Sequence, residues 1–380
     1  LKGSFENGVV LQDYEVFVKS LKGPISNERQ LGLGALRMLS KGAEDPETVS
    51  AFQKALEMAE WSSRLKSICA AQNALAAAGQ KVKVLADSVV TGLSTDQLTA
   101  LTTSQVAALT ASQVGALSTS QIQAMQTHQM VALSSQQVRG MTTSQVASLL
   151  VAQVAAIETA DLAGLTALQV QSLTTEQVAA LTTGQAFALS SLQISSLQTH
   201  QLVAMETSDL EVLELTRVTA LSVTQVKALT TDQIMALTTA QINALDSTQW
   251  AEATTDQIRA LKATQVAAIG TDDLAGLTSE HIGALLSAQV AALTTDQLRA
   301  LDTEQIASIA SDVISALTTA QIVALKTDQA EALTSEQVAS LTTAQLVSFE
   351  TQDLRAITTE NIEAMGSDQI KALTTQQVRN

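Results

Sequence analysis

Residues 101–124 read LTTSQVAA, LTASQVGA and LSTSQIQA, three units of eight residues that share one pattern. The same octad continues from Leu93 to Asn380 without an insertion or deletion, which gives 36 units. If the octad is numbered from its leucine, positions 1 and 6 are apolar in all 36 units. Position 8 is Ala, Gly or Ser in 33 units, and position 5 is Gln in 28. Two apolar sites, one small site and one fixed amide therefore recur together, which indicates a structural repeat.

The octad period fits a short helix that begins again in every unit. A continuous helix turns by about 100° per residue, so its apolar positions would drift around the axis from one octad to the next. Residues 229–234 read LTTDQI, in which a Thr N-cap and a Gln three residues later form the reciprocal capping box. The flanking Leu229 and Ile234 then form the hydrophobic staple pair. The position of the N-cap stays open by one residue, because Thr or Ser is more frequent at position 3 than at position 2, and Thr159 is the alternative cap in its octad.

A helix of five or six residues is unstable alone, so each octad must bury positions 1 and 6 against other octads. We therefore predict an all-α solenoid of 36 octapeptide repeats with one short helix each, in which contacts join nearby repeats only. Small residues at position 8 would let neighbouring octads approach closely, and the glutamines would stack into a ladder. A β-solenoid is the alternative, favoured by Thr and Val but opposed by Ala, Gln and Asp.

The first 92 residues differ from the array. We predict a helical N-terminal or capping domain over residues 1–84, a degenerate transition repeat at 85–92, and the solenoid over 93–380. Asp45, Pro46 and Glu47 are typical of a helix start, and a long helix is expected from there to about Ala78. Five of the eight aromatic residues of the chain also lie in this segment.

Candidate site residues are few. His128 and His200 occupy position 4 far apart in the chain, and His281 replaces the usual Gln and is expected to fill the ladder. Cys69 has no histidine in its own domain, so it is expected to be a small buried side chain rather than a nucleophile. We predict no catalytic, cofactor-binding or metal-binding residue. Two ligand hypotheses are weaker: an ice-binding face of Thr pairs, and calcium at the acidic position-5 residues Asp161, Asp209, Asp273 and Asp353.

The separations between these four aspartates, 48, 64 and 80 residues, are multiples of sixteen and suggest two octads per coil. This spacing is the only sequence signal for the size of a coil.

Composition excludes several classes of function. The net charge of −16 opposes binding to nucleic acid and to anionic membranes. A single cysteine excludes an intrachain disulfide framework, and no run of eighteen apolar residues is present to span a membrane. The chain begins at Leu1 rather than Met, which is compatible with removal of an N-terminal segment. Residues 93–156 contain only Asp96 and Arg139 as charged residues, so this Thr-rich stretch is a candidate lateral packing surface.

The units ALTTDQI and ALTTAQI, at residues 228–234 and 236–242, resemble the octad arrays of very long bacterial surface or secreted proteins. The resemblance covers residues 93–380 and implies no site residues. It favours a non-enzymatic structural protein that forms a rod or filament by self-association and is extracellular or on a cell surface. The alternative is a solenoid scaffold that binds a protein or peptide partner. Variable position-7 residues such as Phe187, Met235 and Arg259 would contribute to such a surface, but they are scattered along the array.

Overall fold

The computed structural model describes residues 90–274 and 276–379, and these are helical throughout, with no β-strand among them. The all-α repeat prediction is therefore confirmed for the array, and the β-solenoid alternative is wrong. The predicted N-terminal domain 1–84, its helix from Asp45, and all but the last three residues of the transition repeat 85–92 lie outside the described residues.

Each octad folds as two extended residues followed by one short helix. In the octad 101–108, position 2 is the N-cap Thr102, with φ −71° and ψ 159°, and the helix α7 (Thr103–Ala108) occupies positions 3 to 8. The next residue, Leu109, is extended again with φ −60° and ψ 145°, and its N–H donates to the carbonyl of Val106. The helix therefore ends after at most six residues, and the chain turns into the next octad.

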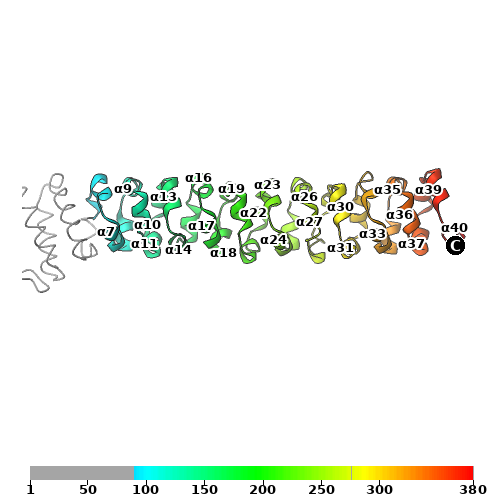
Figure 1. Cartoon of the computed structure of the whole chain (residues 1–380), viewed down its shortest axis with the longest axis horizontal. Helices are drawn as coiled ribbons and strands as arrows, with labels where there is room; N and C mark the ends of the chain where they lie inside the picture. The colour runs from blue at the N-terminus through cyan, green and yellow to red at the C-terminus, as the bar shows by residue number, and fades with distance from the viewer. Residues whose placement is uncertain (1–89, 275, 380) are drawn as a thin grey trace, which may run out of the picture. The chain divides into compact units, whose positions relative to one another are not determined.

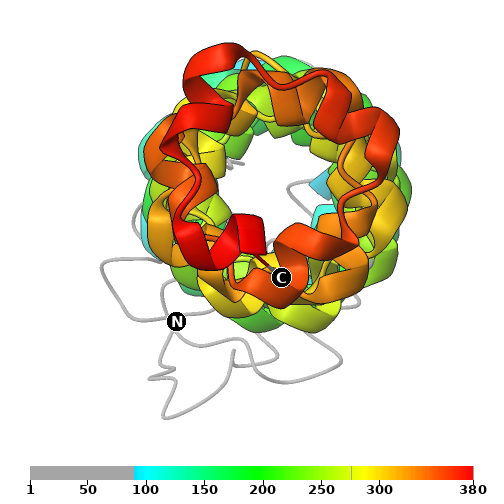
Figure 2. The ribbon, with the colours of Figure 1, turned by 90° about the vertical axis from the view of Figure 1, so that its right-hand side faces the viewer.

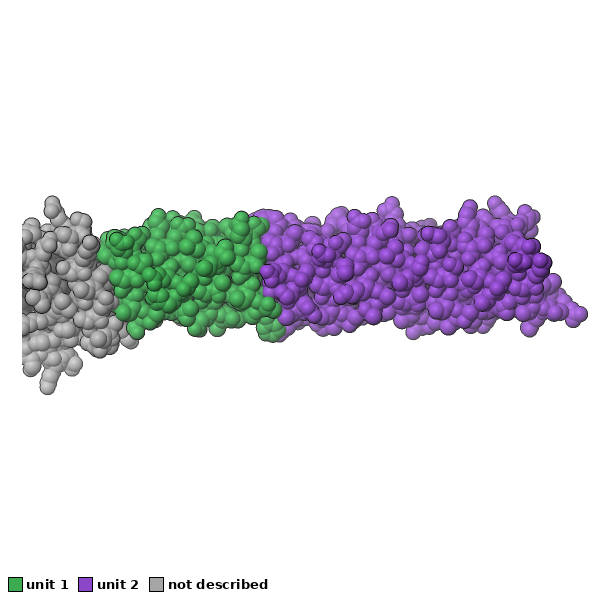
Figure 3. Space-filling model, turned by 45° about the horizontal axis from the view of Figure 1, so that its top comes forward, with its two compact units in different colours: residues 1–189 green, residues 190–380 purple. Residues whose placement is uncertain are grey.

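The chain divides into two compact units, residues 1–189 and 190–380, which are coloured separately in Figure 3. The described part of the first unit contains α6 (Thr95–Thr99), α7, α8 (Ala111–Ala116), α9 (Thr119–Ala124), α10 (Thr127–Val131), α11 (Ser135–Gly140), α12 (Thr143–Ser148), α13 (Val151–Ala156), α14 (Thr159–Leu162), α15 (Ala167–Gln171), α16 (Thr175–Ala179) and α17 (Thr183–Ala188). These elements, labelled in part in Figure 1, follow one another at the octad period.

The second unit repeats the same arrangement. It contains α18 (Ser191–Ser196), α19 (Thr199–Ala204), α20 (Thr207–Glu211), α21 (Leu215–Val218), α22 (Val223–Ala228), α23 (Thr231–Ala236), α24 (Thr239–Ala244), α25 (Ser247–Ala251), α26 (Thr255–Ala260), α27 (Ala263–Val266), α28 (Thr271–Leu274), α29 (Ser279–Gly283), α30 (Ser287–Ala292), α31 (Thr295–Ala300), α32 (Thr303–Ser308), the 3₁₀-helix η2 (Ile314–Ala316), α33 (Thr319–Ala324), α34 (Thr327–Glu331), α35 (Ser335–Ser340), α36 (Thr343–Ser348), α37 (Thr351–Ala356), α38 (Thr359–Glu363), α39 (Ser367–Ala372) and α40 (Thr375–Arg379). Seen from its C-terminal end in Figure 2, the helices of this unit follow one another around a common axis.

Within each unit a helix packs against the helix three octads further along, for example α8 against α11 and α34 against α37. Side-chain hydrogen bonds between coils span 28 and 31 residues, so a coil takes more than three octads, and the two octads per coil suggested by the aspartate spacing are wrong.

The core consists of positions 1 and 6. Every position-1 residue from Leu93 to Met365 and every position-6 residue from Leu98 to Leu354 is buried. Burial of a Leu, Val or Ile side chain contributes roughly 1.5–3 kcal/mol, so tens of such side chains stabilise helices that could not persist alone.

Candidate functional site

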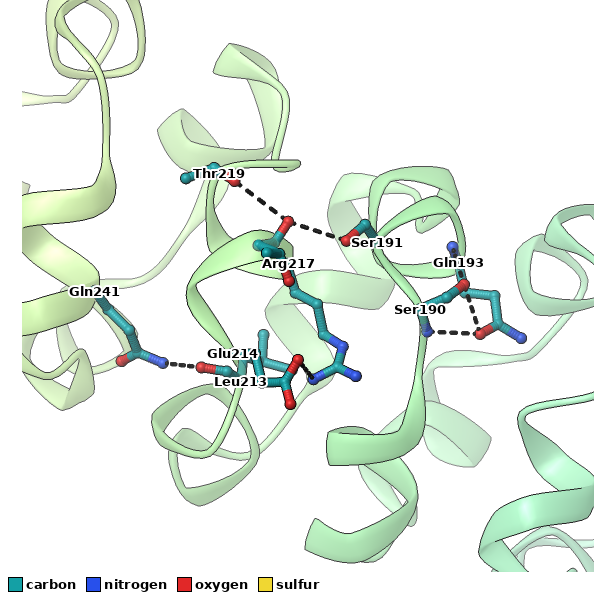
Figure 4. A network of polar contacts seen from close by, with 9 residues as sticks. Ser190, Ser191, Gln193, Leu213, Glu214, Arg217, Thr219 and Gln241 are labelled. Carbon is teal, nitrogen blue, oxygen red and sulfur yellow. Dashed lines mark hydrogen bonds and ion pairs between the residues drawn. The ribbon is translucent and has the colours of Figure 1, made fainter.

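The glutamine at position 5 is the polar residue that the fold uses most. Gln241 on α24 shows its geometry: the side-chain Oε1 accepts the N–H of the N-cap Thr238 at 2.8 Å. The side-chain Nε2 donates to the carbonyl of Leu210 at 2.8 Å and to that of Leu213 at 2.8 Å, both in the coil below. Figure 4 shows the bond from Gln241 to Leu213. The amide is 1% exposed, so one buried side chain holds its own helix start and two carbonyls of another coil.

The same bonds recur along both units with nearly constant geometry. Gln137 in the first unit donates to Val106 and Leu109 at 2.7 and 2.8 Å, 31 and 28 residues earlier. Gln337 in the second unit donates to Ile306 and Ile309 at the same two separations. We call these position-5 residues the bridging glutamines. The predicted ladder is therefore correct in satisfying orphan backbone groups, but each amide bonds to backbone below it rather than to the next amide.

The hydroxyl half of the capping box can be absent while the glutamine half remains. Thr102 accepts the N–H of Gln105 at 3.3 Å, as the sequence predicts for an N-cap at position 2. Where position 2 is Leu150 or Lys262, no side chain caps the helix, yet the N-cap N–H still donates to the glutamine at 2.8 Å. The alternative cap Thr159 is wrong, because Glu158 is the N-cap and Thr159 is the first helical residue.

Position 8 is small because the coil below approaches it. A Cβ on Gly140 would lie 2.6 Å from the carbonyl oxygen of Ala111, and one on Gly276 would lie 2.1 Å from that of Ser247. Both contacts join residues 29 positions apart in the chain. The prediction that small residues allow close approach is confirmed at these positions.

Octads with Asp at position 5 form a second class. Their sequences are IETADLAG, METSDLEV, IGTDDLAG and FETQDLRA, beginning at residues 157, 205, 269 and 349. In these four octads position 2 is Glu or Gly and position 1 is never Leu. Asp at position 5 therefore occurs together with changes at positions 1 and 2 of the same octad. Asp161 accepts from the hydroxyl of Ser135 at 2.9 Å, and Asp353 accepts from that of Thr327 at 2.7 Å. The carboxylates thus bond to position 3 of the coil below instead of bridging its carbonyls.

The aspartates do not gather into a metal centre. Over residues 90–274 and 276–379, no three His, Cys, Asp or Glu side chains lie close enough together to hold a metal ion. In the second unit each Asp is instead followed in the next octad by another replacement of Gln, namely Arg217, His281 and Asn361. Arg217 forms an ion pair with Glu214 at 3.2 Å (Figure 4). Asn361 still donates to the carbonyl of Leu333, 28 residues earlier.

The three histidines have two different roles. His128 and His200 lie exposed at position 4. His281 is 6% exposed, and its Nδ1 accepts the N–H of the N-cap Thr278 at 3.1 Å. A further hydrogen bond joins its ring to the backbone of Ala253, 28 residues earlier, so His281 replaces a bridging glutamine as predicted. Burial lowers the pKa of the His281 imidazole, against the opposing effects of the Ala253 bond and of Glu280.

Two further replacements change the local structure. Val313 at position 5 cannot accept from an N-cap, and its octad folds as a turn and the 3₁₀-helix η2 rather than as an α-helix. Trp250 is the only Trp at position 6, and Ala253, which follows in the next octad, is the only Ala at position 1. Both are buried. The Trp250 Nε1 has no hydrogen-bond partner.

The surface of the described residues has an open hollow, and its lining is uncharged. An open hollow of about 510 Å³ lies over octads 101–116 and 133–140 of the first unit, lined by Ser, Ala, Leu, Thr and Gln side chains such as Ser104 and Gln136. None of these residue types is charged at neutral pH. None of the helices in the described ranges has the length and hydropathy needed to cross a bilayer. Cys69 lies outside the described residues.

Comparison with known families matches the array seven times. The ALTTAQ repeat model matches residues 90–127, 114–156, 154–191, 202–239, 251–287, 306–343 and 346–380. Comparison with curated proteins found no relative of this chain. The matches cover most of the described array, and the chain belongs to the ALTTAQ repeat family.

Proposed function

We propose that the chain is a non-enzymatic structural protein whose array forms a rod or filament by self-association, outside a bacterial cell or on its surface. The observation that carries the proposal is the inter-coil bonding by bridging glutamines. Every coil presents to the next the same carbonyls and the same apolar side chains, so the arrangement has no built-in end. Repeat stacks of this kind need a cover on each terminal coil.

An uncovered coil edge is apolar. The position-6 side chains Ile362, Ile370 and Val378 are 37%, 51% and 67% exposed, whereas Val338 and Leu346 below them are 0% exposed. Any coil that ends such an array needs an apolar cover, and a second copy in that place would make a head-to-tail contact, which does not close and so propagates a fibre. The net charge of −16 supports the same function, because it keeps the long sides of the particles apart.

The absence of an enzymatic role is part of the proposal. It is supported by the hollow over octads 101–116 and 133–140, which is lined by neutral side chains, and by the position of His128 and His200 on exposed helix surfaces. General acid–base chemistry needs titratable groups that converge on one site. The cellular location is tested separately, by protease treatment of intact cells followed by detection of the array.

The assembly is tested by negative-stain imaging and light scattering of the purified chain at rising concentration. We expect elongated particles that associate end to end, and we expect both Ile370→Glu and deletion of residues 1–84 to abolish the association. Leu168→Glu is the matched control, because Leu168 is 68% exposed at position 4 of the first unit and lies on no coil edge. A chain that stays monomeric at every concentration would refute self-association. The alternative, a scaffold for a protein partner, would then remain.

A further inference from the structure

Two successive octads of the second unit, 269–276 and 277–284, both lack a bridging glutamine. They carry Asp273 and His281 at position 5 instead. Below them lie the octads 245–252 and 253–260, since α28 packs against α25 and α29 against α26. We call the contact between 245–260 and 269–284 the seam. On either side of it the usual bonds are present: Gln257 donates to Val226 and Leu229, and Gln289 to Ile258 and Leu261.

At the seam, His281 replaces the missing amide: one ring nitrogen accepts the N–H of its own N-cap, and the other bonds to the backbone of the coil below. Nδ1 accepts the N–H of Thr278 at 3.1 Å, and the ring also bonds to the backbone of Ala253. A neutral imidazole has one acceptor and one donor nitrogen, which is what these two partners require. In the imidazolium both nitrogens carry a proton, so Nδ1–H would face the N–H of Thr278 with no acceptor between them.

The rest of the seam is weaker than a regular coil contact. The Asp273 carboxylate cannot donate to carbonyls, and it bonds to the backbone of Ser247 while Asp246 and Asp272 repel its charge. In the lower coil, the buried Trp250 Nε1 has no hydrogen-bond partner. Apart from the buried apolar side chains, the bonds of His281 are therefore the main polar link between the two coils.

We propose that the seam is a pH-sensitive contact, which holds while His281 is neutral and opens when its imidazole is protonated. Protonation in an acidic medium is sufficient to open the seam, and no other ligand is needed. The charged groups on the elements packed around α29 are Asp256 and Arg259 on α26, Asp302 and Glu304 at α32, and Glu280 on α29 itself. Of these, Glu280 favours the imidazolium, but burial outweighs it.

The direction of the pH effect follows from the folded and unfolded states. Burial lowers the pKa of His281 from 6.5 in the folded chain, so the unfolded chain binds the proton more readily. The stabilisation from His281 is complete above about pH 6.5 and is lost as the pH falls below that value toward the lowered pKa. Asp273 opposes this, because burial and the neighbouring carboxylates raise its pKa, and its protonation relieves the repulsion as the pH falls.

Hydrogen exchange of the full chain at pH 7.5 and pH 5.5, corrected for intrinsic rates, tests the proposal. We expect the protection of amides in 253–260 and 277–284 to fall at pH 5.5, by at most about tenfold because this pH is one unit below the ordinary pKa, while amides in 286–300 keep theirs. His281→Gln restores the usual residue and should remove the pH response. Asp273→Asn removes the opposing titration and should enlarge it.

Two further variants serve as controls. His200→Gln replaces an exposed histidine of the same unit and should leave the response of the seam unchanged. Gln257→His places the same imidazole in a regular octad, where Thr254 donates to the present glutamine at 2.8 Å, and should create a second pH-sensitive contact there. Equal protection at both pH values in the unaltered chain would overturn the proposal, and so would a fall that persists in His281→Gln.

Discussion

Replacement of Gln241 separates the two tasks of a bridging glutamine. Gln241→Met keeps the volume of the side chain but removes the acceptor for Thr238 and the donor for the carbonyls of Leu210 and Leu213. A buried polar group left without a partner costs about 1–3 kcal/mol, and the half-buried Thr238 N–H can turn partly to water. The carbonyl of Leu210 keeps the N–H of Leu213, so the loss falls mainly on the Leu213 carbonyl and the Thr238 N–H, and we expect the free energy of unfolding to fall by about 3 kcal/mol.

Matched variants assign that loss to one half of the site. Thr238→Val removes only the hydroxyl that accepts from Gln241 at 3.2 Å, and should cost about 1 kcal/mol. Gln241→Glu keeps the acceptor for Thr238 but turns a carboxylate toward two carbonyls, so it should cost at least as much as Gln241→Met at neutral pH and less once the Glu is protonated. Asn243→Leu, at exposed position 7 of the same octad, should change stability by less than about 0.5 kcal/mol.

Urea unfolding followed by circular dichroism measures the total effect, and hydrogen exchange over residues 210–213 and 238–245 locates it. If Gln241→Met costs no more than Thr238→Val, the bonds between coils contribute nothing, and the argument for the bridging glutamine fails.

Four other changes test separate features. Val313→Gln restores a bridging amide over Ile282 and Leu285 and should stabilise the chain by about 1–2 kcal/mol in thermal unfolding, with no gain if the 3₁₀ turn is intrinsic to its octad. Gly276→Ala, whose Cβ would meet the Ser247 backbone at 2.1 Å, should destabilise by about 1–3 kcal/mol, while Gly184→Ala, with its nearest neighbour at 3.7 Å, should not. Asp273→Asn should stabilise the chain increasingly as the pH rises above 3.8, because the raised pKa of Asp273 marks a carboxylate that the fold disfavours when charged; a pH-independent effect would contradict this. Chelator should leave the melting temperature unchanged, and a fall of several degrees would instead support calcium at the acidic position-5 residues.

The local fold of the octad could be predicted from the sequence because each octad carries its own signals. The Thr or Ser N-cap, the Gln three residues later and the staple pair lie within six residues, as in Leu229 to Ile234, and α23 begins where they place it. The alternative cap Thr159 was wrong, because a hydroxyl is more frequent at the first helical position than at the cap itself. The pattern of buried positions 1 and 6 was equally accessible, since it does not depend on how many octads form a coil.

The coil itself could not be predicted, because identical octads give the same pattern for any number per turn. The aspartate spacing gave two per coil, but Asp161 and Asp353 vary with Glu158 and Glu350 at their own N-caps rather than with the coil. The role of His281 was anticipated because it stands where Gln does, whereas its partner Ala253 lies 28 residues away and has no signal of its own.

The constant separation of 28 and 31 residues between a bridging glutamine and its two carbonyls bears on how such genes can change length. Insertion of a whole octad into a run of similar units gives each following glutamine another position-6 and position-1 carbonyl in place of the old ones, so every bond is remade. Insertion of a single residue instead moves the glutamines of the next coil away from their acceptors and faces them with side chains. The array can therefore grow or shrink in steps of eight residues with little loss of stability, whereas a one-residue insertion breaks the bonds between coils. This difference accounts for 36 units without an insertion or deletion.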